Sequence, residues 1–159
     1  MGVFSDIGEY SSSISAPRLF KALVVDAPNL IPNLIPQIVK SIVVHGDGGP
    51  GSIRQINFVQ GSELTSLKNR IDEINEESLT FNYTTIEGEI LGDKYECIGY
   101  EIKFEAKADG GSINKMTIKY YTKGDFEVNE EEIKLGKERA MGIYKIVEAY
   151  LLSNPHVYA

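Results

Sequence analysis

The sequence predicts an α+β fold in which an antiparallel sheet wraps around one long C-terminal helix. Residues 38–123 alternate apolar and polar side chains with a period of two, as half-buried strands do. The connections between these alternating runs are short, which favours antiparallel neighbours. Residues 133–151 instead repeat apolar side chains every three or four positions, which is typical of an amphipathic helix.

Length and composition favour one domain over residues 1–159. The chain has 159 residues, of which 42% are hydrophobic and 25% charged, enough to bury a core and enclose a cavity. We expect no membrane partner, because a spanning helix needs about 18 consecutive apolar residues and no such run occurs. Acidic Asp6 and Glu9 stand where a secretion signal is apolar, and the single Cys97 suits a reducing compartment, so we expect a cytoplasmic protein.

The first part of the chain predicts a strand followed by two short helical segments. Residues 3–12 alternate loosely, as a strand does. Ser15 ahead of Pro17 is typical of a helix N-terminus, and residues 18–26 carry apolar side chains on one helical face. Three prolines limit residues 29–37 to a short helix or turns.

Six further strands are expected between residues 38 and 123, with turns at residues 76–77, 92–93 and 109–111. Their covered faces mix apolar side chains with polar tips. The polar members are Tyr83, Tyr100, Asn114 and Tyr120. A dry core rarely holds so many polar groups, so we infer an amphipathic cavity between sheet and helix. The alternative is that the aromatic side chains fill an ordinary dry core.

The C-terminal helix has well-specified ends. Asn129 is a good N-cap, Glu132 three residues later completes a capping box, and Pro155 ends the helix after about six turns. On its apolar face, Gly136 and Ala140 leave space that larger side chains would fill.

Residues 45–52 read HGDGGPGS and carry the glycine spacing of dinucleotide-binding loops. The glycines are Gly46, Gly48, Gly49 and Gly51. In such a loop a helix must follow, so that its N-terminus faces the phosphates. Here residues 52–59 alternate with a period of two, Pro50 lacks an N–H, and Asp47 adds a negative charge. We therefore predict a hairpin connection with glycines at positive φ.

Charge and ligand-type residues exclude several other functions. The formal net charge is −7, from 23 acidic and 16 basic residues, which disfavours nucleic acid as a partner. Two separated histidines and one cysteine do not make a metal site, and no cofactor is expected. The acidic run at residues 129–132 is explained by the helix N-terminus, which favours negative charge.

Longer motifs extend over essentially the whole chain. They are MGVF at the start, PRLFKALV (17–24), GDGGPGSI (46–53), RIDEI (70–74), NYTTIEGEILGD (82–93), GGSI (110–113), YYTKGD (120–125) and VEAYLL (147–152). On these motifs the chain resembles the intracellular plant pathogenesis-related proteins of class 10, the birch-pollen major-allergen family of the START-like superfamily. The resemblance implies a helix-grip fold. In that fold a seven-stranded antiparallel sheet grips the long helix, two short helices close one end, and a large cavity holds lipophilic molecules.

The resemblance also implies which residues line the cavity. They are Leu23, Ile38, Phe58, Leu67, Asn69, Phe81, Tyr83, Ile98, Tyr100, Ile102, Met116, Tyr120, Gly136, Ala140 and Ile143. Three positions depart from the family pattern. Relatives usually have Glu where His45 stands, commonly Lys where Arg54 stands, and a smaller or proline-containing pair where Glu89 and Ile90 stand at the cavity mouth. The mouth and its charges select the ligand.

The function expected from the resemblance is non-catalytic binding or carriage of amphipathic plant metabolites or hormones by a monomer, in defence or stress. Such ligands include cytokinins, flavonoids and sterol-like compounds. One alternative is a ribonuclease, for which the family residues correspond to Glu96, Glu148 and Tyr150. The other is a condensing enzyme like norcoclaurine synthase, for which Tyr100, Lys115 and Glu101 are the acid–base candidates. Strand alternation points Lys115 and Glu101 away from the face that carries Tyr100.

Overall fold

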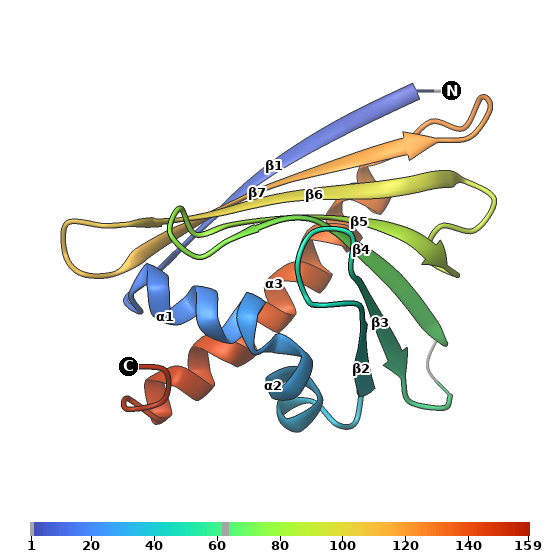
Figure 1. Ribbon diagram of the computed structural model, residues 1–159. Coiled ribbons are helices and arrows are strands. Elements are labelled where there is room, and N and C mark those ends of the chain that lie inside the picture. Colours follow the sequence, from blue (N-terminus) through green and yellow to red (C-terminus); the bar gives the residue numbers. More distant parts are fainter. Residues whose placement is uncertain (1, 62–63) are drawn as a thin grey trace.

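The computed structural model describes residues 2–61 and 64–159 and has a curved sheet with its helices on one side (Figure 1). In this part of the chain the sheet has seven strands in the order β1-β7-β6-β5-β4-β3-β2. The elements are β1 (Gly2–Ser12), α1 (Ala16–Phe20), the π-helical turn η1 (Lys21–Val25), α2 (Ala27–Leu34), β2 (Val39–His45), β3 (Ile53–Phe58), β4 (Ser66–Asn75), β5 (Thr80–Gly88), β6 (Tyr95–Ala106), β7 (Ser112–Thr122) and α3 (Glu130–Ser153).

The strand order confirms the antiparallel meander. Strands β2 to β7 are neighbours in sequence and in space, and β1 returns to the edge beside β7, where Phe4 lies opposite Tyr120. Register shifts interrupt three strand pairs, including two in the pairing of β4 with β5. Such bulges bend strands, which helps the sheet to curve towards the helices. Figure 1 shows α3 running across this concave side.

The two short helices differ from the prediction in detail. Ser15 occupies the N-cap position of α1, but its side chain makes no capping hydrogen bond, so the expected cap is only positional. After Phe20 the chain widens into η1, where the Asp26 N–H donates to the Lys21 carbonyl at 2.8 Å. As expected, α2 is short: it has eight residues, with Pro28 in its first turn and Pro32 inside it.

The start of α3 forms only half of the predicted capping box. The Asn129 side chain accepts the Glu132 N–H at 2.9 Å, as expected. The Glu132 carboxylate is engaged elsewhere: it accepts from Lys94 Nζ at 2.8 Å and from the Tyr95 hydroxyl at 3.2 Å. This side chain therefore ties the helix N-terminus to the start of β6 in place of closing the box.

The end of α3 is held by the guanidinium of Arg18 on α1. It donates to the carbonyl oxygens of Leu151, Asn154 and Val157 at 2.8, 2.6 and 2.7 Å. The carbonyls of Leu151 and Asn154 also accept backbone N–H groups, from Asn154 at 3.3 Å and from Val157 at 3.1 Å, so the guanidinium adds a charged donor to a helix end with few backbone hydrogen bonds. One arginine therefore fastens the C-terminal segment to the short helices, beside which the chain ends in Figure 1.

Buried apolar side chains form two clusters at opposite ends of the concave side. The first joins the short helices to the C-terminal half of α3 and includes Phe20, Ile71 and Val147. The second comprises Leu91, Tyr95, Ile98, Ile118 and Tyr120, with Phe126, Val128 and Ile133 packed against it. Within the described residues, none of the helices combines the length and apolar character that crossing a membrane requires.

Candidate functional site

The middle of the concave face is less covered than its ends. On β6, Ile98 and Ile102 are 2% and 9% exposed, whereas Tyr100 between them is only partly buried. On β5, Phe81 and Thr85 are buried, and Tyr83 between them is again only partly buried. Alternate residues of a strand share one face, so Tyr83 and Tyr100 are the positions on these two strands where the concave face is less completely buried.

These two tyrosines form one aromatic surface across β5 and β6. They are register partners, and their rings stack at 4.5 Å with an interplanar angle of 17°. Phe81 extends the surface, with its ring centroid 5.0 Å from that of Tyr83. Apolar contact with such rings stabilises a planar ligand strongly, because aromatic side chains offer a large area with few rotatable bonds.

Both hydroxyls stay protonated. Burial, followed by the electrostatic effect of the neighbouring Tyr120 phenol, raises the pKa of Tyr100 to about 12. Burial raises the pKa of Tyr83 far above its ordinary value, and only the nearby Arg54 charge opposes this. At neutral pH the phenols therefore donate and accept hydrogen bonds, which suits orienting a ligand more than acid–base catalysis.

Arg54 on β3 borders this aromatic surface. Its guanidinium carbon lies 5.2 Å from the centre of the Phe81 ring, and the residue is 9% exposed. Nε has no hydrogen-bond partner in the described part of the chain. Burial lowers the pKa of Arg54, although arginine remains charged in proteins. A cation–π contact contributes about 1–2 kcal/mol, whereas burying an ion costs several kcal/mol, so Phe81 offsets only part of the cost.

A cavity of about 350 Å³ opens beside Arg54, between the start of α2, the glycine loop and the end of β4. Its lining residues are Val25, Pro28, Val44, Asp47, Gly48, Arg54, Ile74 and Glu76. Sites for small organic ligands begin at about 300 Å³ and are mostly apolar with a few polar groups. The cavity meets the first criterion, and its lining combines four apolar side chains with three charged ones, of which Arg54 is the basic member.

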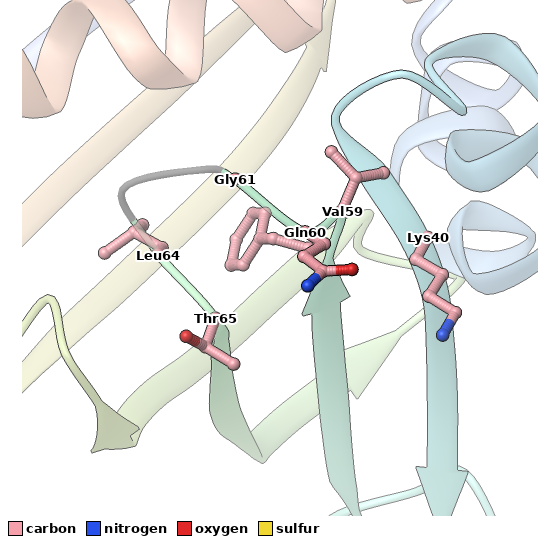
Figure 2. A pocket seen from close by; sticks show the side chains of 7 residues that line it. Lys40, Val59, Gln60, Gly61, Leu64 and Thr65 are labelled. Carbon is pink, nitrogen blue, oxygen red and sulfur yellow. The ribbon is translucent and has the colours of Figure 1, made fainter.

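A second cavity, of about 240 Å³, lies at the other end of β2 and β3 (Figure 2). It is lined by Lys40, Phe58, Val59, Gln60, Gly61, Leu64 and Thr65. The Glu89 carboxylate accepts the backbone N–H groups of Thr65 and Ser66 at 2.7 and 3.2 Å. The Thr65 hydroxyl, followed by these two N–H groups, lowers the pKa of Glu89. One of the residues that departs from the family pattern thus joins the segment after β5 to this rim.

The glycine loop is a hairpin connection, as predicted. It joins β2 to β3, and three of its glycines have positive φ: 115° at Gly46, 93° at Gly48 and 89° at Gly51. Its N–H groups are used internally. Gly48 donates to Ser52 Oγ and Gly49 to Asp47 Oδ1, both at 2.9 Å, and Gly51 donates to a β4 carbonyl. These donors are therefore not free to hold a phosphate.

The predicted lining residues fall into three groups by exposure. Phe81, Ile98, Ile102 and Tyr120 are buried; Leu23, Phe58, Leu67, Asn69, Tyr83, Tyr100, Met116, Gly136 and Ala140 are partly buried; Ile38 and Ile143 are 47% and 39% exposed. Ile38 lies in the turn before β2, and Ile143 lies on α3 one position before the buried Tyr144. The space at Gly136 is also taken: the Tyr120 hydroxyl oxygen lies 2.5 Å from where a Cβ would stand.

The three ribonuclease candidates are not brought together. Glu96 follows Tyr95, whose hydroxyl contacts Glu132 in the first turn of α3. Glu148 lies sixteen residues further along the same helix, about 24 Å at 1.5 Å per residue, and Tyr150 lies beyond it. Glu96 thus lies on β6 next to the residue that contacts the first turn of α3, whereas Glu148 lies near the other end of that helix, and one phosphodiester cannot contact both carboxylates.

The condensing-enzyme candidates are also separated. The Lys115 ammonium pairs with Glu105 at 2.7 Å, and Glu101 pairs with Lys119 at 3.2 Å. Both pairs lie on the opposite face of the sheet from Tyr100, as alternation predicts. Within residues 2–61 and 64–159, no three His, Cys, Asp or Glu side chains are grouped to hold a metal ion.

Arg54 is the feature that sequence reasoning undervalued. It appears in the sequence only as a departure from the family's usual lysine. Its spacing from Ile56 and Phe58 in β3 is the available signal, because alternate residues put all three on the same face. That face is the concave one, where Arg54 lies over Phe81.

Comparisons with known proteins agree with this fold. Residues 1–154 match the model of the "Pathogenesis-related protein Bet v 1 family". The chain is 49% identical to the major allergen Pru ar 1 of Prunus armeniaca over 159 residues, 99% of each protein. The crystal structure of Ara h 8.0201 superposes with a TM-score of 0.87 at 36% identity, covering 96% of this chain and all of that one.

Norcoclaurine synthase from Thalictrum flavum is a more distant neighbour. Its complex with dopamine and hydroxybenzaldehyde superposes with a TM-score of 0.73 at 19% identity, covering 96% of this chain and 88% of that one. At this identity the likeness concerns the fold alone.

Proposed function

Because the chain belongs to the pathogenesis-related Bet v 1 family, we propose that it binds amphipathic small molecules on the concave face of its sheet, without catalysing a reaction. The observation that carries the proposal is the stacked pair Tyr83 and Tyr100, left partly accessible between buried neighbours in the centre of the sheet. A ligand would cover the parts of Tyr83 and Tyr100 that remain accessible beside the two apolar clusters.

The chemistry of this surface defines the ligand class. Apolar area removed from water contributes about 25 cal/mol per Å², so the rings favour a flat, largely apolar body. The protonated hydroxyls of Tyr83 and Tyr100 and the amide of Asn69 favour a ligand with a few polar groups. Asn69 is oriented by the Thr85 hydroxyl, which donates to its Oδ1 at 2.7 Å. Cytokinins, flavonoids and sterol-like hormones, the ligands implied by the family resemblance, have this amphipathic character.

The biological setting follows from the same proposal. A monomer that carries or buffers such a metabolite in the cytosol needs no cofactor and no disulfide, and Cys97 is a free thiol. The family is described as pathogenesis-related, and its members include plant allergens. On this basis we propose a role in plant defence or stress.

Calorimetric titration with a matched pair of flavonoids, one hydroxylated and one lacking that hydroxyl, tests the proposal. We expect saturable binding of both by the wild-type protein. Tyr83→Phe removes one hydroxyl and is expected to weaken the hydroxylated ligand about tenfold while changing the other little. Tyr121→Phe is the matched control, because it removes the same atom from β7 on the side of Gly99, away from the concave face.

Two outcomes would contradict the proposal. Absence of binding by cytokinins, flavonoids and steroids alike would mean that the aromatic side chains only fill a core. Cleavage of an RNA oligonucleotide that is lost in Glu148→Gln would assign the function to the ribonuclease alternative, despite the separation of Glu148 on α3 from Glu96 on β6.

A further inference from the structure

Arg54 carries a charge that the fold does not neutralise. The residue is 9% exposed, and Nε has no hydrogen-bond partner among the described residues. In the same part of the chain no carboxylate forms an ion pair with its guanidinium. Arginine does not lose its proton in proteins, so the group is a buried cation at a cavity whose two carboxylates, Asp47 and Glu76, form no ion pair with it.

An unpaired cation of this kind needs an anion from outside the chain. The Phe81 ring at 5.2 Å supplies only the weak attraction of an aromatic face. We propose that Arg54 is an anion subsite of the ligand cavity and that the preferred ligands are amphipathic organic acids, a single carboxylate or sulfonate on an apolar body. The inference rests on the proposed binding function and narrows its ligand class.

The lining of the cavity argues for a monoanion with an apolar body. Val25, Pro28, Val44 and Ile74 offer apolar surface, and the planar guanidinium matches an oxyanion through two parallel hydrogen bonds. Asp47 and Glu76 line the same cavity, and because their repulsion grows with the charge of the ligand, they disfavour a multiply charged phosphate more than a monoanion. The Asp47 carboxylate is already held by Gly49 N–H and Ser52 Oγ at 2.9 and 3.1 Å, turned into its own loop.

The adjoining aromatic surface gives the apolar body a place to lie. Arg54 lies over Phe81, and Phe81 packs against Tyr83, which stacks on Tyr100. An acid whose charged end meets Arg54 can extend its rings over this row. Arg54 then binds the charged group, and the neighbouring aromatic side chains contact the apolar body of the same ligand.

Two fluorescent probes of the same hydrocarbon skeleton separate the charge from the apolar body. Anilinonaphthalene sulfonate carries one negative charge, and N-phenylnaphthylamine is its neutral counterpart. Dissociation constants of both are measured for the wild type, for the neutral variants Arg54→Met and Arg54→Gln, and for Arg70→Gln. Arg70 is the matched control, because it is an exposed arginine on β4 that pairs with Asp72. Thermal unfolding without probe checks that each variant folds.

We expect each Arg54 variant to lose at least about tenfold in affinity for the sulfonate and less than about twofold for the neutral probe. Arg70→Gln is expected to change both by less than about twofold. The probe-free Arg54→Met protein should be at least as stable as wild type, because the substitution removes an unpaired buried charge. Inorganic phosphate at matched ionic strength should not displace the sulfonate.

The proposal is overturned if the two probes lose affinity equally in the Arg54 variants, if the sulfonate loses none, or if phosphate alone displaces it. In those cases binding of the neutral probe to the wild type still supports the cavity itself. Failure of both probes to bind the wild type would overturn the proposed function together with this inference.

Discussion

Gly136 on α3 faces Tyr120 on β7 so closely that the contact gives a quantitative prediction. A Cβ atom added at Gly136 would meet the Tyr120 hydroxyl oxygen at 2.5 Å and Cζ at 3.8 Å. The tyrosine is 4% exposed and its ring packs 5.5 Å from that of Tyr95, so it has little room to move. Gly142 on the same helix is the reference, because an added Cβ there meets nothing within 4 Å.

The expected energies follow from these distances. In a helix interior, Gly→Ala usually stabilises by about 1 kcal/mol, and this is the expectation for Gly142→Ala. At Gly136 the same gain is opposed by overpacking, which costs about 1–3 kcal/mol. Gly136→Ala is therefore expected to be neutral to about 2 kcal/mol destabilising. The two variants should differ by about 1–3 kcal/mol, which is about 2–12 °C in melting temperature for a domain of this size.

Urea unfolding followed by circular dichroism measures both variants. A third protein, Gly136→Ala with Tyr120→Phe, isolates the clash. Phenylalanine lacks the oxygen at 2.5 Å and leaves only the ordinary 3.8 Å contact, so Gly136→Ala should stabilise in that background. Equal stabilisation by Gly136→Ala and Gly142→Ala in the wild-type background would refute the contact and place this half of α3 further from the sheet.

Two further predictions concern the ends of α3. Arg18→Met leaves three carbonyl oxygens at the C-terminal end without their charged donor and is expected to lower the free energy of unfolding by about 2–4 kcal/mol in urea; a loss no larger than that of the exposed-site variant Arg70→Met would contradict the clamp. The pKa of Glu132 is lowered from its ordinary value of 4.5, first by the hydrogen bond from Lys94. The stabilisation that Glu132 provides is therefore complete above the unfolded-state pKa of 4.5 and is lost as the pH falls through the lower folded-state pKa. The stability difference between wild type and Glu132→Gln should therefore vanish in acid, and a pH-independent difference would show that the charge of Glu132 is irrelevant.

Much of the fold could be predicted because its signals are local. The period-two alternation at residues 98–104 and 114–120 identified β6 and β7, and the change to helical spacing after residue 130 identified α3. Residues 52–59, which follow the glycine loop, alternate as a strand does, and this correctly indicated a hairpin connection and not a nucleotide-binding loop. Each of these depends on neighbours within a few positions.

The site could be predicted only as a set of residue types. The tyrosines of β5 and β6 were expected to face inward, and they do, but their stacking and partial exposure depend on what two separate clusters cover. The exposure of Ile38 and Ile143 likewise depends on the exact path of the turn and of the helix. A family pattern transfers positions but not the covering of each side chain.

The sequence by itself determined the strands, the long helix, the hairpin at the glycine loop and the family, because periodicity, turn residues and motifs are written along the chain. Only the tertiary structure decided which polar groups find partners. The Glu132 carboxylate binds Lys94 and Tyr95 and does not complete the capping box. Arg18 donates to carbonyl oxygens more than 130 positions away, and Arg54 is buried without forming an ion pair among the described residues. Hydrogen bonding and desolvation depend on distances between segments remote in sequence, and those distances exist only once the sheet has closed over the helix.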